Sequence, residues 1–117
     1  MSDFVIYHNS RCSKSRQTLA LLEEAGIKAK AIYYLETPPN VEELANLAKL
    51  LGMRPIEFTR TKDSDFKALG LKTDEISDEQ VLELLASNPK LIERPIVVKD
   101  GKKAILGRPP ENVMKLI

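Results

Sequence analysis

The chain has 117 residues, a formal net charge of +1, one cysteine and one histidine. This length suits one domain with its own core, and the near-neutral charge gives no global field that would attract nucleic acid or an anionic membrane. No window reaches the roughly 18 apolar residues that a transmembrane helix needs, and the N-terminus lacks the pattern of a signal peptide. One cysteine cannot form an intramolecular disulfide. We therefore expect a cytoplasmic protein that binds neither nucleic acid nor membrane.

The first third of the chain predicts a strand, a helix and a second strand. An apolar run covers about residues 3–8, a helical pattern covers about 13–25 and stops at Gly26, and a second strand pattern covers 28–35. Because the connection is short, the two strands should be parallel and joined by a right-handed crossover. The expected core face of the helix carries Leu19, Leu22 and Ala25.

Residues from about 40 to 88 predict a block of helices. Asn40 with Glu43 is a helix-start signal, and Ser77 with Gln80 is another. Between them lie shorter helical stretches interrupted by Gly52 and other breaks. This block separates two parts of the chain that both form sheet.

The last part predicts two antiparallel strands and a helix. Residues 93–99 form a strand entered through Pro95, the Asp100-Gly101 pair predicts a hairpin turn, and residues 103–106 pair back. A helix follows the Pro109-Pro110 pair. The order β-α-β, helical insertion, β-β-α predicts a thioredoxin-like α/β fold with a mixed four-stranded sheet. We expect one such domain over 1–117 with the insertion at about 40–88, and in this fold the proline before the third strand is typically cis.

Cys12 lies where the first strand turns into the first helix. Unpaired N–H groups and the helix dipole stabilise an anion there, and a thiolate is such an anion. Arg11, Lys14 and Arg16 add positive charge. A small buried cysteine that only packs is the alternative, but these polar and basic neighbours favour a nucleophilic Cys12.

Two further polar residues flank Cys12, and each has two interpretations. The His8 ring could fill the inner face of the strand, or it could hold a proton near the sulfur. Ser15 could offer its hydroxyl to the thiolate, or it could be an ordinary polar residue of the first helical turn. The residue pattern decides neither case.

Three arginines lie at the ends of predicted elements, and their forked guanidinium groups suit tetrahedral oxyanions. They are Arg60, Arg94 and Arg108. In a thioredoxin-like layout the Arg94 and Arg108 ends can approach the Cys12 loop. Taken singly, each arginine fits a solvated surface position better than a binding role.

Several other kinds of site are excluded by spacing. A dithiol redox motif needs a second cysteine where Ser15 stands, and a low-molecular-weight phosphatase loop needs arginine where Thr18 stands. One cysteine and one histidine cannot supply the four ligands of a structural zinc site, so we predict no metal.

Four motifs together resemble the glutaredoxin-coupled arsenate reductase family, ArsC. They are His8-Asn9-x-x-Cys12-x-x-Ser15-Arg16-x-Thr18-Leu19, Tyr34-Leu35-Glu36-x-Pro38, Arg94-Pro95-Ile96-Val97-Val98 and Gly107-Arg108-Pro109. The resemblance spans nearly the whole chain. The family's best-matched members carry proline at position 10 and glycine at position 13, where this chain has Ser10 and Ser13.

The resemblance implies an enzyme in which Cys12 attacks arsenate while Arg60, Arg94 and Arg108 grip it. It further implies that His8 and Ser15 help to keep Cys12 ionised. Glutathione, as co-substrate, would add to the bound arsenic, and glutaredoxin would reduce the adduct so that arsenite leaves. No bound cofactor is expected, and the lack of a surplus apolar stripe favours a monomer.

Two other functions stay open at this point. A regulatory module similar to the Spx proteins would dock onto RNA polymerase, although the redox-sensing members usually carry a second cysteine where this chain has Ser15. A glutathione-dependent thiol oxidoreductase would instead act on a mixed disulfide. The Spx proteins resemble the ArsC family in fold.

Overall fold

The computed structural model describes residues 3–117, which form two compact units. Of the described residues, the sheet unit comprises 3–37 and 94–117, and the helical unit comprises Pro38–Glu93. The insertion predicted at about 40–88 falls inside the helical unit. In the part of the chain that the structure describes, no helix is long and apolar enough to cross a membrane.

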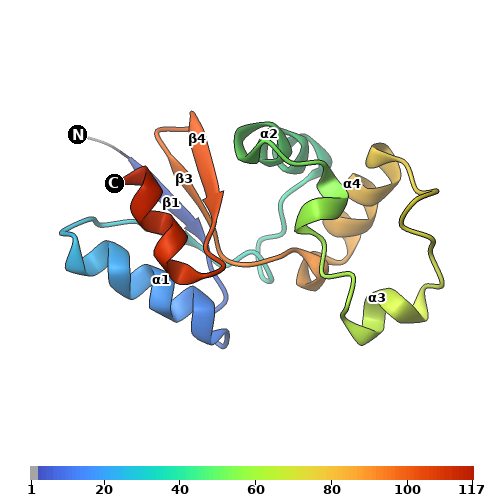
Figure 1. The fold of residues 1–117 in the computed structure, drawn as a ribbon, viewed down its shortest axis with the longest axis horizontal. Helices are drawn as coiled ribbons and strands as arrows, with labels where there is room; N and C mark the ends of the chain where they lie inside the picture. The colour runs from blue at the N-terminus through green and yellow to red at the C-terminus, as the bar shows by residue number, and fades with distance from the viewer. Residues whose placement is uncertain (1–2) are drawn as a thin grey trace. The chain divides into compact units, whose positions relative to one another are not determined.

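The sheet unit contains a mixed sheet of four strands in the order β2-β1-β3-β4; Figure 1 labels β1, β3 and β4. Its elements are β1 (Phe4–Tyr7), α1 (Ser13–Glu24), β2 (Lys30–Ile32), β3 (Ile96–Lys99), β4 (Lys103–Leu106) and the 3₁₀ helix η3 (Pro110–Leu116). β1 pairs in parallel with β2 and antiparallel with β3, and β3 pairs antiparallel with β4. This arrangement confirms the predicted thioredoxin-like α/β fold.

The second strand is shorter than predicted. It covers Lys30–Ile32 rather than 28–35, because the backbone turns at Tyr33, whose carbonyl accepts from the N–H groups of Glu36 and Thr37, both at 2.9 Å. Tyr33 and Tyr34 therefore leave the strand just past its carboxyl end. That end lies beside the end of β1, since Ile32 is in register with Tyr7.

α1 and η3 cover one face of the sheet and contact each other (Figure 1). The hydrophobic core of this unit combines buried side chains of β1, β3, α1 and η3: Phe4, Ile6, Leu22, Val97, Val113 and Leu116. Leu22 of α1 has no exposed surface, and burying such a side chain contributes about 1.5–3 kcal/mol.

The core face of α1 differs from the prediction in two of its three residues. Leu22 is buried as expected, but Leu19 is only partly buried and Ala25 is exposed. Ser15 and Thr18 take the fully buried positions instead. A polar side chain can occupy a core face when its hydroxyl is bonded, and the Thr18 Oγ1 donates to the Lys14 carbonyl at 2.8 Å.

The connections at both ends of the β3–β4 hairpin follow from their residue types. Asp100 and Gly101 have φ values of 54° and 64°, the left-handed conformations of the predicted tight turn. The Arg94–Pro95 bond is cis, as expected for this fold, and the Arg108–Pro109 bond is also cis.

The helical unit contains α2 (Val41–Leu51), η1 (Pro55–Phe58), α3 (Ser64–Ala68), α4 (Asp78–Ser87) and η2 (Pro89–Leu91). The predicted helix starts are confirmed. The Asn40 Oδ1 accepts from the Glu43 N–H at 2.8 Å, and Ser77 and Gln80 form a reciprocal capping box. α2 packs on α4.

Candidate active site

Cys12 is the N-cap residue of α1. Its backbone is extended, with φ −92° and ψ 122°, and it is held at both sides: its N–H donates to the Asn9 carbonyl and its carbonyl accepts from the Arg16 N–H, each at 3.0 Å. The side chain is partly exposed. A soluble reactant can therefore reach the sulfur at the positive end of the helix dipole.

The surroundings of the Cys12 thiol favour its ionised form. Burial raises the pKa, but the N–H of Ser15, the Arg94 guanidinium and the N–H of Lys14 together lower it by more, so the pKa lies below its ordinary value of 9.0. The thiolate is the form of cysteine that acts as a nucleophile. At neutral pH Cys12 therefore carries more thiolate than a free cysteine.

Arg94 and Arg108 lie together in the sheet unit. The Arg108 Nη1 donates to the Arg94 carbonyl at 3.3 Å, and both side chains are partly buried. The Cys12 thiolate and Tyr34 raise the pKa of Arg94 by more than its burial lowers it. Arg94 is thus a permanent cation beside the sulfur.

The two arginine loops are also tied through their backbones. The Gly107 N–H donates to the Pro95 carbonyl at 2.8 Å. A Cβ atom on Gly107 would lie 2.7 Å from the Thr18 Oγ1 and 2.8 Å from the Pro95 Cγ. This close contact requires glycine, and it links the Arg108 loop to α1 and to the Arg94–Pro95 turn.

His8 and Ser15 form a buried pair next to the Cys12 loop. The His8 Nδ1 lies 2.7 Å from the Ser15 Oγ, which also accepts the Asn9 N–H at 3.1 Å. His8 is 5% exposed and Ser15 is fully buried. The Ser15 hydroxyl thus forms hydrogen bonds with His8 and with the loop backbone, while the Ser15 N–H stabilises the thiolate.

The His8 ring also meets Tyr33 edge-on, with ring centroids 5.7 Å apart. Burial of the ring, and then the positive charge of Arg16, lower the pKa of His8 below 6.5. At physiological pH the ring is therefore neutral, and one of its nitrogens can accept a hydrogen bond.

Tyr34 is a residue near the site that its sequence pattern did not single out for chemistry. It is 1% exposed, and Arg94, Asn9 and Cys12 all lie close enough to affect the pKa of its hydroxyl. Burial raises that pKa, Arg94 and Asn9 lower it, and Cys12 raises it, with a net increase. Its position two residues after β2 is the signal that could have identified it, because the carboxyl ends of two parallel strands meet at one sheet edge.

Arg60 belongs to the helical unit. Its Nε lies 3.7 Å from the Asp63 Oδ2, and its N–H donates to the Leu91 carbonyl at 2.7 Å. Its part in gripping a substrate stays a prediction.

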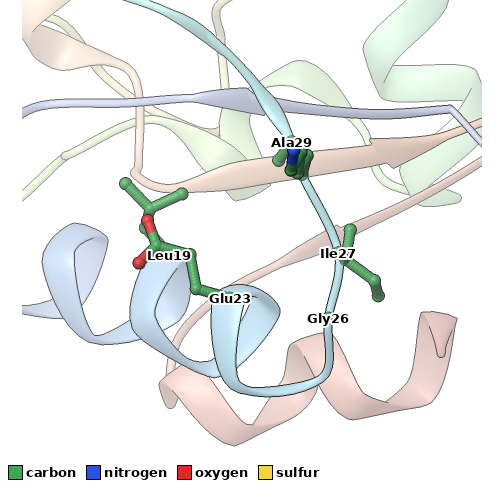
Figure 2. Close-up of a pocket in the computed structure, with 6 residues that line it drawn as sticks. Leu19, Glu23, Gly26, Ile27 and Ala29 are labelled. Atoms are coloured by element: carbon green, nitrogen blue, oxygen red, sulfur yellow. The ribbon is translucent and has the colours of Figure 1, made fainter.

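Two other features of residues 3–117 bear on the kind of site. These residues contain no group of three or more His, Cys, Asp or Glu side chains that could hold a metal ion. A depression of about 450 Å³ lies beside the C-terminal half of α1, and Figure 2 shows Leu19 and Glu23 on the helix and Ile27 and Ala29 on the neighbouring segment. None of the predicted site residues lines it.

Comparisons with known proteins agree over nearly the whole chain. A sequence model of the ArsC family matches residues 7–116. The chain is 48% identical to the uncharacterized protein YfgD of Escherichia coli K12, over 96% of this chain and 94% of the other. It is 45% identical to an arsenate reductase of Neisseria meningitidis serogroup A, over 97% of each chain. The solved structure of an arsenate reductase from Vibrio cholerae superposes with a TM-score of 0.93 at 49% identity, covering 98% of each chain.

Proposed function

The chain belongs to the ArsC family, and we propose that it reduces arsenate to arsenite through the Cys12 thiolate. The observation that carries this proposal is the pairing of a partly exposed cysteine at the N-terminus of α1 with the Arg94 guanidinium. The same groups that stabilise a thiolate also attract an oxyanion. The relatives named arsenate reductase identify arsenate as the first oxyanion to test.

The first step is nucleophilic attack. The Cys12 thiolate attacks arsenic(V), a sulfur–arsenic bond forms, and one arsenate oxygen leaves as water after taking up two protons. Arg94 and Arg108 would offset the negative charge of the arsenate oxygens, because guanidinium groups donate two parallel hydrogen bonds to an oxyanion. Arg60 is proposed as the third arginine of this grip. The neutral His8 and the Ser15 hydroxyl support the loop that presents the sulfur.

The second step needs thiols from other molecules, because the chain has one cysteine. We propose that glutathione forms a second sulfur–arsenic bond and displaces another oxygen as water. A glutaredoxin thiolate then attacks the glutathione sulfur, and the pair of electrons in its bond to arsenic stays on the arsenic, which becomes arsenic(III). Water cleaves the remaining bond to Cys12. Overall, one arsenate and two thiols give arsenite, one mixed disulfide and water.

The setting of this chemistry is part of the proposal. An enzyme with a single cysteine needs thiols from other molecules, and the reducing cytoplasm supplies them as glutathione. We therefore propose that the enzyme is cytoplasmic. Its substrates reach one site on one chain, and we propose a monomer with no bound cofactor.

The test is a reconstituted assay. Purified protein, arsenate, glutathione and glutaredoxin are mixed and arsenite is measured. We expect turnover with all four and none when arsenate or glutathione is left out. Cys12→Ser should lower turnover by about 10³-fold or more while its circular dichroism spectrum and unfolding midpoint stay close to those of the wild type.

Two additional arms separate the possible reductants and substrates. Thioredoxin replaces glutaredoxin in one arm, and equal rates there would disprove the specific coupling to glutaredoxin. A glutathionylated thiol replaces arsenate in the other. Reduction of that thiol with no arsenite formed from arsenate would make the protein a thiol oxidoreductase and refute the proposed function.

A further inference from the structure

The Tyr34 hydroxyl is buried without a well-formed hydrogen bond. Its oxygen is shielded from solvent, and none of residues 3–117 makes a hydrogen bond of normal geometry with it. Burying a hydroxyl in this state costs free energy, because its hydrogen bonds to water are lost and not replaced. Such a group calls for an explanation, and a missing ligand is one.

The position of the hydroxyl relates it to the candidate active site. Tyr34 lies in the turn that follows β2, beside the end of β1 that leads into the Cys12 loop. Arg94, Asn9 and Cys12 are the groups that influence it. It is therefore a neutral polar group next to the sulfur and the guanidinium.

The neighbours of Tyr34 offer many donors and few free acceptors. Arg94 has only N–H donors, and the Asn9 Oδ1 already accepts the Arg11 N–H at 3.0 Å. The Cys12 sulfur is stabilised by the Ser15 and Lys14 N–H groups and by Arg94. The phenol O–H is thus short of an acceptor in the free protein, and an oxyanion placed at Cys12 would bring several oxygen acceptors.

We propose that Tyr34 is a substrate-binding residue that donates its O–H to an oxygen of the anion held at Cys12 and Arg94. The raised pKa of the phenol keeps it protonated, so it can donate at neutral pH. The identity of the anion as arsenate rests on the proposed function, whereas the hydrogen bond itself would form with any tetrahedral oxyanion at this place.

The test uses Tyr34→Phe, which removes one oxygen and keeps the ring. Cys12 is alkylated with iodoacetamide in the presence of increasing sulfate, phosphate or arsenate, and the anion concentration that halves the rate is measured. We expect this concentration to rise about 10-fold or more in the variant, as for loss of a hydrogen bond to a charged group. The KM for arsenate should rise in the same proportion.

The stability of the free protein gives an independent readout. Because the hydroxyl has no bonded partner there, Tyr34→Phe should unfold at the same temperature as the wild type or higher without anion. The matched control is Tyr33→Phe. It removes the same oxygen from the neighbouring residue, which is 49% exposed, and its anion protection should equal that of the wild type.

Several outcomes would overturn the inference. If anions protect Tyr34→Phe as well as they protect the wild type, the hydroxyl has no role in binding. If Tyr34→Phe unfolds at a lower temperature than the wild type without anion, the hydroxyl has a structural role instead. A rise in the Cys12 pKa with unchanged protection would mean that Tyr34 positions Arg94 instead. The inference would also be overturned if none of the three anions slows the alkylation of Cys12 in the wild type.

Failure of the proposed function is distinguishable. If the wild type forms no arsenite but sulfate protection weakens in Tyr34→Phe, the Tyr34 assignment stands and arsenate reduction fails. If the wild type reduces arsenate and Tyr34→Phe has the same KM for arsenate, the proposed function stands and the Tyr34 assignment fails.

Discussion

At the scale of single residues, Ser15 has two separate tasks in the Cys12 loop. Its backbone N–H lowers the pKa of the Cys12 thiol, while its hydroxyl bonds to the His8 ring and to the Asn9 N–H. The interaction with the thiolate therefore depends on the helical position of residue 15 and not on its side chain. The side chain instead satisfies two groups that would otherwise be buried without partners.

Arg94→Ala should raise the pKa of Cys12. The guanidinium is one of the groups that stabilise the thiolate, and its loss leaves the burial of the sulfur less well offset. The measurement is the rate of alkylation by iodoacetamide as a function of pH, whose midpoint should move to higher pH. Arsenate turnover should also fall, by roughly 10- to 100-fold, as expected for loss of a hydrogen bond to a charged group.

Arg11→Ala is the matched control for this prediction. Arg11 is next to Cys12 in the sequence but exposed, and it is not among the groups that shift the thiol pKa. An alkylation midpoint that moves equally in both variants would contradict a specific role of Arg94.

Because the His8 ring is buried, we expect the free energy of unfolding to fall as the pH becomes acidic. Its pKa is lower in the folded protein than the ordinary 6.5, mainly through burial, so the unfolded chain binds the proton more tightly. The contribution of His8 is full above about pH 6.5 and is lost as the pH falls through the lower, folded pKa. His8→Gln should have a smaller drop in unfolding temperature between pH 7.5 and 5 than the wild type.

Carboxylates also titrate towards acid pH, so the informative quantity is the difference between His8→Gln and the wild type at each pH. Parallel curves would show that the folded and unfolded pKa values of His8 are equal. That result would contradict the burial argument.

At the scale of elements, α1 is placed by its polar residues as much as by its apolar ones. Ser15, Thr18 and Leu22 lie on one helical face and are fully buried. The Thr18 Oγ1 bonds within the helix and also forms the closest contact with the position of a Cβ on Gly107. The helix that carries Cys12 thus packs directly against the loop that carries Arg108.

Gly107→Ala should destabilise the protein by about 1–3 kcal/mol, the usual cost of overpacking. The added methyl group would lie within 3 Å of Thr18 and of Pro95, so α1 or the Arg94–Pro95 turn has to shift. Arsenate turnover should fall as well, since both sides of the site move. Chemical denaturation and steady-state kinetics check the two effects.

Gly101→Ala separates steric crowding from backbone preference. Gly101 has a φ of 64°, and a methyl group added to it would meet no atom within 4 Å, so alanine there strains only the hairpin turn. Its turnover should stay at the wild-type level. Unchanged stability and turnover in Gly107→Ala would show that the contact relaxes without cost.

At the scale of the whole molecule, the candidate site combines residues from the two ends of the chain. Cys12 follows β1, whereas Arg94 and Arg108 flank the β3–β4 hairpin. The antiparallel pairing of β1 with β3, with Tyr7 opposite Ile96, joins these segments. Arg60, which we propose as the third arginine that grips arsenate, belongs to the helical unit, Pro38–Glu93.

Arg60→Ala should raise the KM for arsenate about 10-fold or more, because a charged hydrogen-bond donor to the anion is lost. The alkylation midpoint of Cys12 should not move, since Arg60 is not among the groups that shift the thiol pKa. Arg54→Ala in the same unit is the control: Arg54 pairs with Asp78 at 2.9 Å on the surface. Equal KM values for both variants would remove Arg60 from the site.

The sequence by itself determined the features that depend on neighbouring residues. The helix starts at Asn40 and Ser77, the Asp100-Gly101 turn and the order of strands and helices all follow from local hydrogen bonds and backbone preferences. Cys12 at a helix N-terminus belongs to this group, because a strand followed by a helix already implies its position.

Only the tertiary structure decided the features that depend on distant partners. The face of α1, the bond between His8 and Ser15 and the unsatisfied Tyr34 hydroxyl each arise where segments separated in sequence meet. A polar residue is buried or exposed according to whether such a partner exists. Residue type and spacing do not contain that information, since the partner is chosen by the packing of the folded chain.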